Sequence, residues 1–115
     1  MHRLREAYLA WSAVLPHIAK SARYGIGARI DNRFLSLLER THVTYFSARA
    51  LRGEKIANCI VELDTLKFLL ATAWEAKHIS NHQYELVALK LEEVGKMFGG
   101  WKKSLATSNK NRTLW

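Results

Sequence analysis

Several residue types that mark particular protein classes are scarce in this chain of 115 residues, which has one cysteine and one proline. The lone cysteine, Cys59, excludes an internal disulfide framework, fits a reducing compartment, and lies among apolar residues as a small buried side chain would. No apolar run approaches the length of about 18 residues that a membrane span needs. Glu6 interrupts the apolar part of the N-terminal segment, so we also expect no secretion signal.

Apolar residues follow helical rather than strand spacing. They recur at intervals of three and four over residues 3–20, 27–49, 54–77 and 80–106, and alternating apolar runs are missing. The predicted core face of the second segment comprises Ile30, Phe34, Leu37, Leu38, Thr41 and Tyr45. Four amphipathic helices with short links predict an all-α fold, an antiparallel up-down four-helix bundle over residues 1–106. Residues 107–115 are expected to form a flexible polar tail.

Helix breaks are predicted from proline, glycine and capping residues. Pro16 predicts a kink or break in the first helix, and residues 21–27 predict a loop. Gly53 predicts the break between the second and third helices. Ser80 and Gln83 have the spacing of a capping box, which predicts the start of the fourth helix.

Three glycines, Gly95, Gly99 and Gly100, fall inside the last predicted helix. Each interior glycine costs about 0.5–1 kcal/mol relative to alanine, so a compensating contact is expected. Gly95 and Gly99 lie beside the core stripe, where small residues allow another helix to approach closely. The alternative is that Gly99 and Gly100 end the helix, although Trp101 and Leu105 continue the apolar register beyond them.

A second apolar stripe lies on the predicted outer side of the third helix. Val61 and Phe68 are on this side, with Leu69 near them, and the second helix likewise carries Leu35 and Phe46 away from its core face. A lone bundle has no use for such a stripe, although scattered exposed apolar residues are common. We therefore expect a homo-oligomer with contacts at Val61, Phe68, Leu69, Gly95 and Gly99.

Patterns that carry catalysis are missing from the sequence. Two Glu-x-x-His pairs occur, Glu39/His42 and Glu75/His78, but they fall at different depths of the predicted helix hairpin and do not converge. The chain has no phosphate-cradling glycine loop, no Cys-x-x-Cys pair and no nucleophile elbow. We therefore expect no enzyme activity, no metal and no cofactor.

Positive charge is the strongest functional signal. Eighteen Lys and Arg residues against ten Asp and Glu residues leave a net charge of +8 at pH 7, which favours a polyanionic partner such as nucleic acid. Arginine suits phosphate because its planar fork can bond two oxygens at once. The alternative is a solvated face with some pairing to Asp31 and Glu39. The candidate phosphate-binding residues on this charge pattern are Arg23, Arg29, Arg33, Arg40, Lys96, Lys102 and Lys103.

Two long segments resemble a known family. They are LPHIAKSARYGIGARIDNRFLSLLE and IVELDTLKFLLATAWEAKHISNHQYELVALKLEEVGKMFGGWKKS. The most specific marks are residues 24–30 with Arg29, the LDTLKFLL block, and the EVGKMFGGW ending. Over about residues 11–104 the chain resembles the accessory variability determinant (Avd) proteins of diversity-generating retroelements. These are similar in turn to bundle proteins encoded by intervening sequences of bacterial large-subunit ribosomal RNA genes.

The resemblance implies properties that the residues alone do not show. It implies a homopentameric barrel of bundles, encoded by a prokaryote or phage and located in the cytoplasm, with no enzyme activity of its own. It implies binding to the retroelement's reverse transcriptase and to RNA or DNA, in support of adenine-directed mutagenic cDNA synthesis and retrohoming. The matched LDTLKFLL block adds Lys67 to the candidate nucleic-acid-binding residues. The alternative function is a structural RNA-binding bundle of the ribosomal intervening-sequence type.

Overall fold

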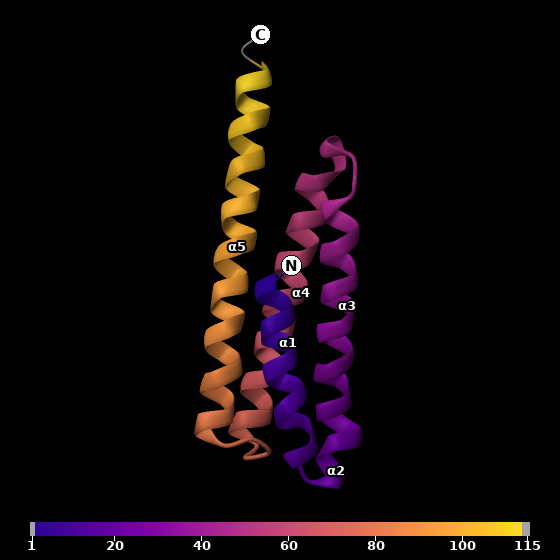
Figure 1. Ribbon diagram of the computed structural model, residues 1–115, viewed down its shortest axis with the longest axis vertical. Helices are drawn as coiled ribbons and strands as arrows, with labels where there is room; N and C mark the ends of the chain where they lie inside the picture. The colour runs from indigo at the N-terminus through magenta and orange to yellow at the C-terminus, as the bar shows by residue number, and fades with distance from the viewer. Residues whose placement is uncertain (1, 114–115) are drawn as a thin grey trace.

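The computed structural model describes residues 2–113, with side chains described through residue 106. Its long helices are α1 (His2–Val14), α3 (Ala28–Tyr45), α4 (Arg49–Glu75) and α5 (Asn81–Thr113), and the short segments are a 3₁₀ turn (Leu15–His17), α2 (Lys20–Ala22) and a π-helical stretch (Arg23–Gly27). The long helices run alternately down and up, and each is joined to the next by a short connection (Figure 1). The predicted all-α, up-down four-helix bundle is confirmed, and no strand occurs among residues 2–113.

The connection from α1 to α3 is wound rather than a loop. The predicted break at Pro16 is confirmed, since the proline lies in the first turn of the 3₁₀ segment. The predicted loop over residues 21–27 is wrong, because these residues form α2 and the π-helical stretch with one kink at Gly25. A Cβ on the buried Gly27 would lie 3.2 Å from Leu15 Cδ1 and 3.3 Å from the carbonyl oxygen of Ala22. The close packing of this connection therefore depends on Gly27.

The turn between α3 and α4 lies earlier than Gly53. It falls between Tyr45 and Arg49, so the predicted boundaries of 27–49 and 54–77 are corrected to Ala28–Tyr45 and Arg49–Glu75. Gly53 lies inside the first turns of α4, where the cost of one glycine is small compared with the packing of a long helix. The turn itself contains neither glycine nor proline, so it gave no break signal in the sequence.

The last helix starts where the capping box predicted. The Ser80 amide donates to Gln83 Oε1 (2.8 Å), and the Gln83 amide donates to Ser80 Oγ (3.1 Å). The helix then passes Gly95, Gly99 and Gly100 without a break. It continues to Thr113, so the predicted end near residue 106 is wrong. The predicted flexibility of residues 107–115 stays a prediction, and positions 114 and 115 lie outside the described residues.

The core runs between all four long helices. Trp11 of α1 stacks on Phe34 of α3 with ring centroids 6.2 Å apart, and both side chains are fully buried. Other fully buried side chains are Leu4, Ile30, Leu37, Leu66, Val87, Leu91, Val94 and Phe98. Tyr45, predicted to face the core, is instead 58% exposed. Thr44 is buried in its place and satisfies its hydroxyl by donating to the carbonyl oxygen of Arg40 (2.7 Å).

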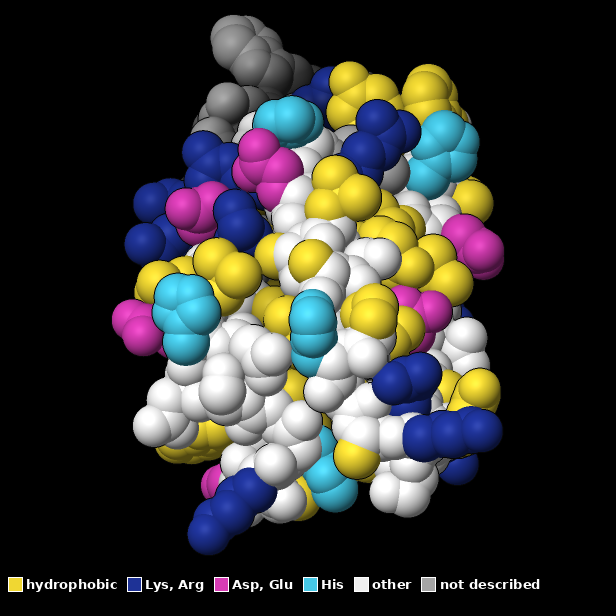
Figure 2. Space-filling model, turned by 60° about the horizontal axis from the view of Figure 1, so that its bottom comes forward, with side chains coloured by type: hydrophobic (Ala, Val, Ile, Leu, Met, Phe, Trp, Pro, Cys, Tyr) yellow, Lys and Arg dark blue, Asp and Glu magenta, His cyan; other side chains and the backbone are white. Residues whose placement is uncertain are grey.

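The surface is mixed rather than uniformly basic. Figure 2 shows Lys and Arg side chains in several groups, with exposed hydrophobic side chains between them. None of the helices in the described part of the chain combines the length and the low polarity that crossing a membrane requires.

Candidate nucleic-acid interface

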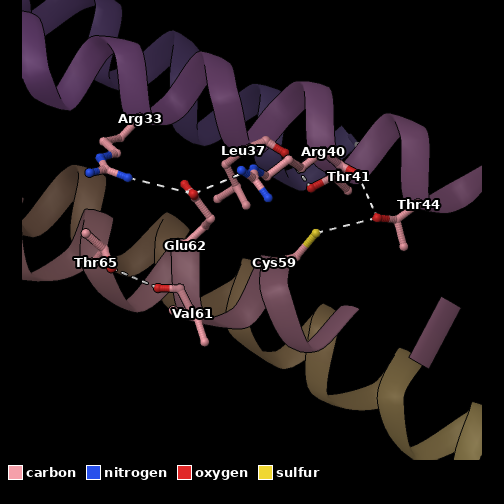
Figure 3. A network of polar contacts seen from close by, with 9 residues as sticks. All are labelled: Arg33, Leu37, Arg40, Thr41, Thr44, Cys59, Val61, Glu62 and Thr65. Carbon is pink, nitrogen blue, oxygen red and sulfur yellow. Dashed lines mark hydrogen bonds and ion pairs between the residues drawn. The ribbon is translucent and has the colours of Figure 1, made fainter. Parts of the chain in front are cut away.

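Arg33 and Arg40 lie about two helical turns apart on α3, so helical geometry places them on one side. Glu62 of α4 lies between them (Figure 3). Its Oε1 atom is 3.7 Å from Arg33 Nη1 and 3.6 Å from Arg40 Nε. Both contacts are ion pairs, but their N–O distances are too long for good hydrogen bonds. Two guanidinium groups therefore share one carboxylate, which leaves one excess positive charge and unsaturated donors.

The shared carboxylate is the least solvated member of this group. The side chain of Glu62 is 15% exposed, whereas those of Arg33 and Arg40 are 40% and 53% exposed. The second oxygen of Glu62, Oε2, is buried and finds no hydrogen-bond partner among the described residues. Burying part of a carboxylate is costly unless cations compensate. The arginines therefore stabilise Glu62, and Glu62 in turn holds both guanidiniums close together at the surface.

A groove between α3 and α4 extends from Arg40 toward the turn that joins these helices. Lys55 and Asn58 line it from α4, and Glu39 is the acidic residue in the lining. The complete lining is Ser36, Glu39, Arg40, Val43, Thr44, Lys55 and Asn58. Positive charge and hydrogen-bond donors thus come from both helices. Sequence reasoning missed Glu62, Lys55 and Asn58, because the register between two helices decides which α4 residues face the α3 arginines.

The remaining arginines on the predicted list have different surroundings. Arg29 lies one turn before Arg33 on α3 and is exposed. Arg23 is tied to the backbone, since its Nη2 atom donates to the carbonyl oxygens of Pro16 (2.9 Å) and Ile18 (3.0 Å). Arg23 therefore holds the wound connection between α1 and α3. Arg29, Arg33 and Arg40, which form the α3 stripe, are better placed for phosphate.

The predicted lysines gather near the other side of α4. Lys67 donates to Glu92 of α5 (3.1 Å), which occupies one of its three donor hydrogens. Lys96 and Lys67 line a second groove, between α4 and α5. Lys102 and Lys103 follow on α5 and are exposed. The structure therefore separates the predicted set into an α3 group and an α4–α5 group.

The outer face of α4 lies between these two basic groups. Val61 is 64% exposed and Phe68 is 69% exposed. The hydroxyl groups of Thr65 and Thr72 donate back to the carbonyl oxygens of Val61 (3.0 Å) and Phe68 (2.8 Å), so they are already satisfied. Leu69 instead packs against the core. The outer face of α4, defined by Val61, Thr65, Phe68 and Thr72, thus carries no charge at these positions and exposes two large apolar side chains.

The two glycines predicted to allow close approach differ. A Cβ on Gly95 would lie 3.5 Å from Lys67 Nζ and 3.6 Å from Leu63 Cδ2, which is ordinary van der Waals contact with side chains of α4. No described atom lies within 4 Å of the corresponding position at Gly99. Gly95 therefore faces side chains of α4 but leaves room for a Cβ, and any contact at Gly99 would have to come from another molecule.

Metal chemistry finds no support in the described residues. No group of three or more His, Cys, Asp or Glu side chains among them is arranged to hold a metal ion. The buried Cys59 contacts Thr44 at an Sγ–Oγ1 distance of 3.7 Å and lies in the core rather than at a surface site (Figure 3).

Comparison with known proteins identifies a family for this chain. No curated protein and no solved structure shows significant similarity to the chain. The family model described as bAvd-like matches residues 3–105, which includes all of α1 except His2, all of α3 and α4, and most of α5. This match covers nearly the whole chain and confirms the resemblance seen in the sequence. The chain therefore belongs to the bAvd-like family.

Proposed function

We propose that this chain is a non-enzymatic accessory protein of a diversity-generating retroelement. It binds the element's reverse transcriptase and nucleic acid in the cytoplasm of a prokaryotic host, and so supports mutagenic cDNA synthesis and retrohoming. Membership of the bAvd-like family and the net charge of +8 support this proposal. The observation that carries the nucleic-acid part is the pair Arg33 and Arg40, which share the single carboxylate of Glu62.

The arginine pair is suited to phosphate rather than to base edges. Each guanidinium has five N–H donors, and the long contacts to Glu62 leave most of them available. Contacts of this kind position a nucleic acid without reading its sequence. They also release counterions, so log K falls with log salt by about 0.7–0.9 per neutralised phosphate.

Replacing Arg29, Arg33 and Arg40 together by glutamine tests the nucleic-acid role. We expect the triple variant to bind unrelated sequences more weakly and to the same degree. The slope of log K against log salt should fall by the amount that corresponds to about one to three phosphate contacts. The matched control replaces Arg3, Arg5 and Lys20 by glutamine, which removes the same charge from residues that do not line the α3–α4 groove. Equal salt slopes for the two triple variants would show that net charge, and not the α3 stripe, drives binding.

The reverse transcriptase separates the proposed function from its alternative. A ribosomal intervening-sequence type of bundle would use similar phosphate contacts but would have no such enzyme partner. Co-expression with the reverse transcriptase of the same element, followed by affinity purification at high salt, should recover a complex of the two proteins. Recovery of this chain alone would contradict the accessory role while leaving RNA binding in place.

A further inference from the structure

The turn between α3 and α4 carries a cluster of exposed aromatic side chains. Phe46 is 71% exposed and Tyr45 is 58% exposed. The ring centroid of Phe46 lies 5.0 Å from that of His42 and 5.2 Å from that of Tyr45, both in edge-to-face geometry. Tyr45 also contacts Trp101 of α5, at 6.2 Å. Because α1 begins only partway along the bundle, it does not cover this end (Figure 1).

Hydrogen bonds hold the turn that presents these rings. Arg52 donates from Nε to the carbonyl oxygen of Ser47 (2.9 Å) and from Nη2 to that of Tyr45 (3.1 Å). The Ser47 hydroxyl donates to the carbonyl oxygen of Val43 (2.6 Å). These bonds satisfy carbonyl groups at the end of α3 and restrain its connection to α4. The aromatic surface is therefore preorganised, although nothing in the bundle core requires it.

The aromatic turn lies at the end of α3 near which the groove between α3 and α4 also ends. Val43 and Thr44 line the groove and directly precede Tyr45 and Phe46 in the chain. The groove has two cations, Arg40 and Lys55, against one carboxylate, Glu39, and exposed rings lie near its end. Cations with exposed rings nearby are the combination used for unpaired nucleic acid, with phosphates on the cations and bases on the rings.

We propose that residues 42–47, the last turn of α3 and the start of its connection to α4, form a stacking platform for unpaired bases of a nucleic-acid strand whose phosphates lie in the α3–α4 groove. This inference rests on the proposed nucleic-acid binding and adds a preference to it. Bases within a duplex are already stacked on one another, so the platform favours a single strand. The rings read no base edge, and the preference is independent of sequence.

Binding of a labelled RNA strand and of its duplex, measured by fluorescence anisotropy, tests the platform. Phe46→Leu keeps an apolar side chain but removes the ring, and should weaken single-strand binding by about 5- to 10-fold, the lower part of the range for one stacked base. Duplex binding should not change. Phe46→Trp should keep the wild-type affinity, and the added indole fluorescence should be quenched by the bound strand.

The matched control is Tyr24→Leu. Tyr24 is 73% exposed and lies in the π-helical stretch at the opposite end of the bundle, so its loss should change neither affinity (Figure 1). If Phe46→Leu weakens binding of the single strand and of the duplex equally, or weakens neither, the stacking platform is excluded, whereas the proposed nucleic-acid binding is not. If the wild type binds neither ligand, both proposals fall. If Phe46→Leu abolishes capture of the reverse transcriptase with strand affinity intact, the turn docks protein and the stacking proposal is overturned.

Discussion

Asp31 of α3 accepts hydrogen bonds from two aromatic residues of α1. Trp11 donates from Nε1 to Asp31 Oδ1 (3.3 Å), and the Tyr8 hydroxyl also bonds the Asp31 carboxylate. The Tyr8 ring packs edge-on against Phe34, with centroids 5.7 Å apart. Burial raises the pKa of Tyr8 above its ordinary value, and the hydrogen bond to Asp31 and the charge of Asp31 raise it further.

This raised pKa predicts a loss of stability at alkaline pH. The pKa of Tyr8 is higher in the folded state than the ordinary value of 10.0, so its contribution is fully present below pH 10 and is lost as pH rises through the folded pKa. Tyr8→Phe keeps the ring and removes the titrating hydroxyl. Urea unfolding measured at increasing pH from 10 upward should therefore show that the free energy of unfolding falls more steeply for the wild type than for Tyr8→Phe. Parallel stability curves would contradict the assignment.

The backbone of Lys77 adopts a left-handed conformation that is unfavourable for residues other than glycine. It follows the C-terminus of α4 with φ of 64°, and the amide of His78 closes the helix end by donating to the carbonyl oxygen of Ala73 (2.9 Å). A left-handed residue at this position is usually glycine, because a Cβ costs about 1–2 kcal/mol there.

Lys77→Gly should therefore raise the free energy of unfolding by about 1 kcal/mol, seen as a higher urea midpoint at an unchanged slope. The control Lys77→Ala removes the same charge and keeps the strained conformation, so it should stay close to the wild type. A gain in Lys77→Ala as large as that in Lys77→Gly would assign the effect to charge rather than to the backbone.

At the scale of elements, α5 is continuous although it contains glycines at three positions. Its apolar register passes from Phe98 through Trp101 to Leu105, and packing along that stripe outweighs the propensity cost of Gly99 and Gly100. Gly95 differs from the other two because Leu63 and Lys67 of α4 lie against it.

Gly95→Leu should destabilise the bundle more than Gly100→Leu. A leucine at 95 must displace side chains of α4, and overpacking of this kind typically costs about 1–3 kcal/mol. A leucine at 100 meets no described atom within 4 Å of its Cβ position and gains helix propensity. Thermal unfolding followed by circular dichroism measures both variants. Equal melting temperatures would show that α4 does not depend on the small residue at 95.

At the scale of the whole molecule, the outer face of α4 is the surface that a lone bundle leaves unexplained. Its four defining residues carry no charge and span about three helical turns, and the basic groups of both neighbouring grooves lie beside them, with Asp64 at the edge of the α4–α5 groove. Exposed stripes of this kind mark interfaces. A homopentamer built through Val61 and Phe68 remains a prediction, and it would repeat the Arg33–Arg40 group around a ring.

Light scattering of the purified chain should show a homo-oligomer at micromolar concentration. Phe68→Glu should shift the mass toward the monomer, because a carboxylate buried in an apolar contact lacks a partner. Leu89→Glu is the matched control, since Leu89 is 60% exposed and lies on α5. A monomeric wild type, or equal masses for both variants, would remove this interface. Helicity should be unchanged in both, since neither side chain is in the core.

What the sequence determined by itself is what depends on positions within one helix. Helical periodicity predicts four helices, Pro16 predicts the break in the first of them, and the Ser80–Gln83 box predicts the start of α5; the structure confirms all three. The same periodicity places Arg33 and Arg40 on one side of α3, because residues of a helix are related by a constant rotation.

Only the tertiary structure decided what depends on two helices at once. The place of Glu62 between the arginines and the pairing of Lys67 with Glu92 follow from packing register, which no local spacing encodes. The turn at residues 46–48 was missed for a related reason. The hydrogen bonds that order this turn come from Arg52, which already lies inside α4. Gly53, which predicted a break, does not interrupt α4, because the packing of a long helix outweighs the cost of one glycine.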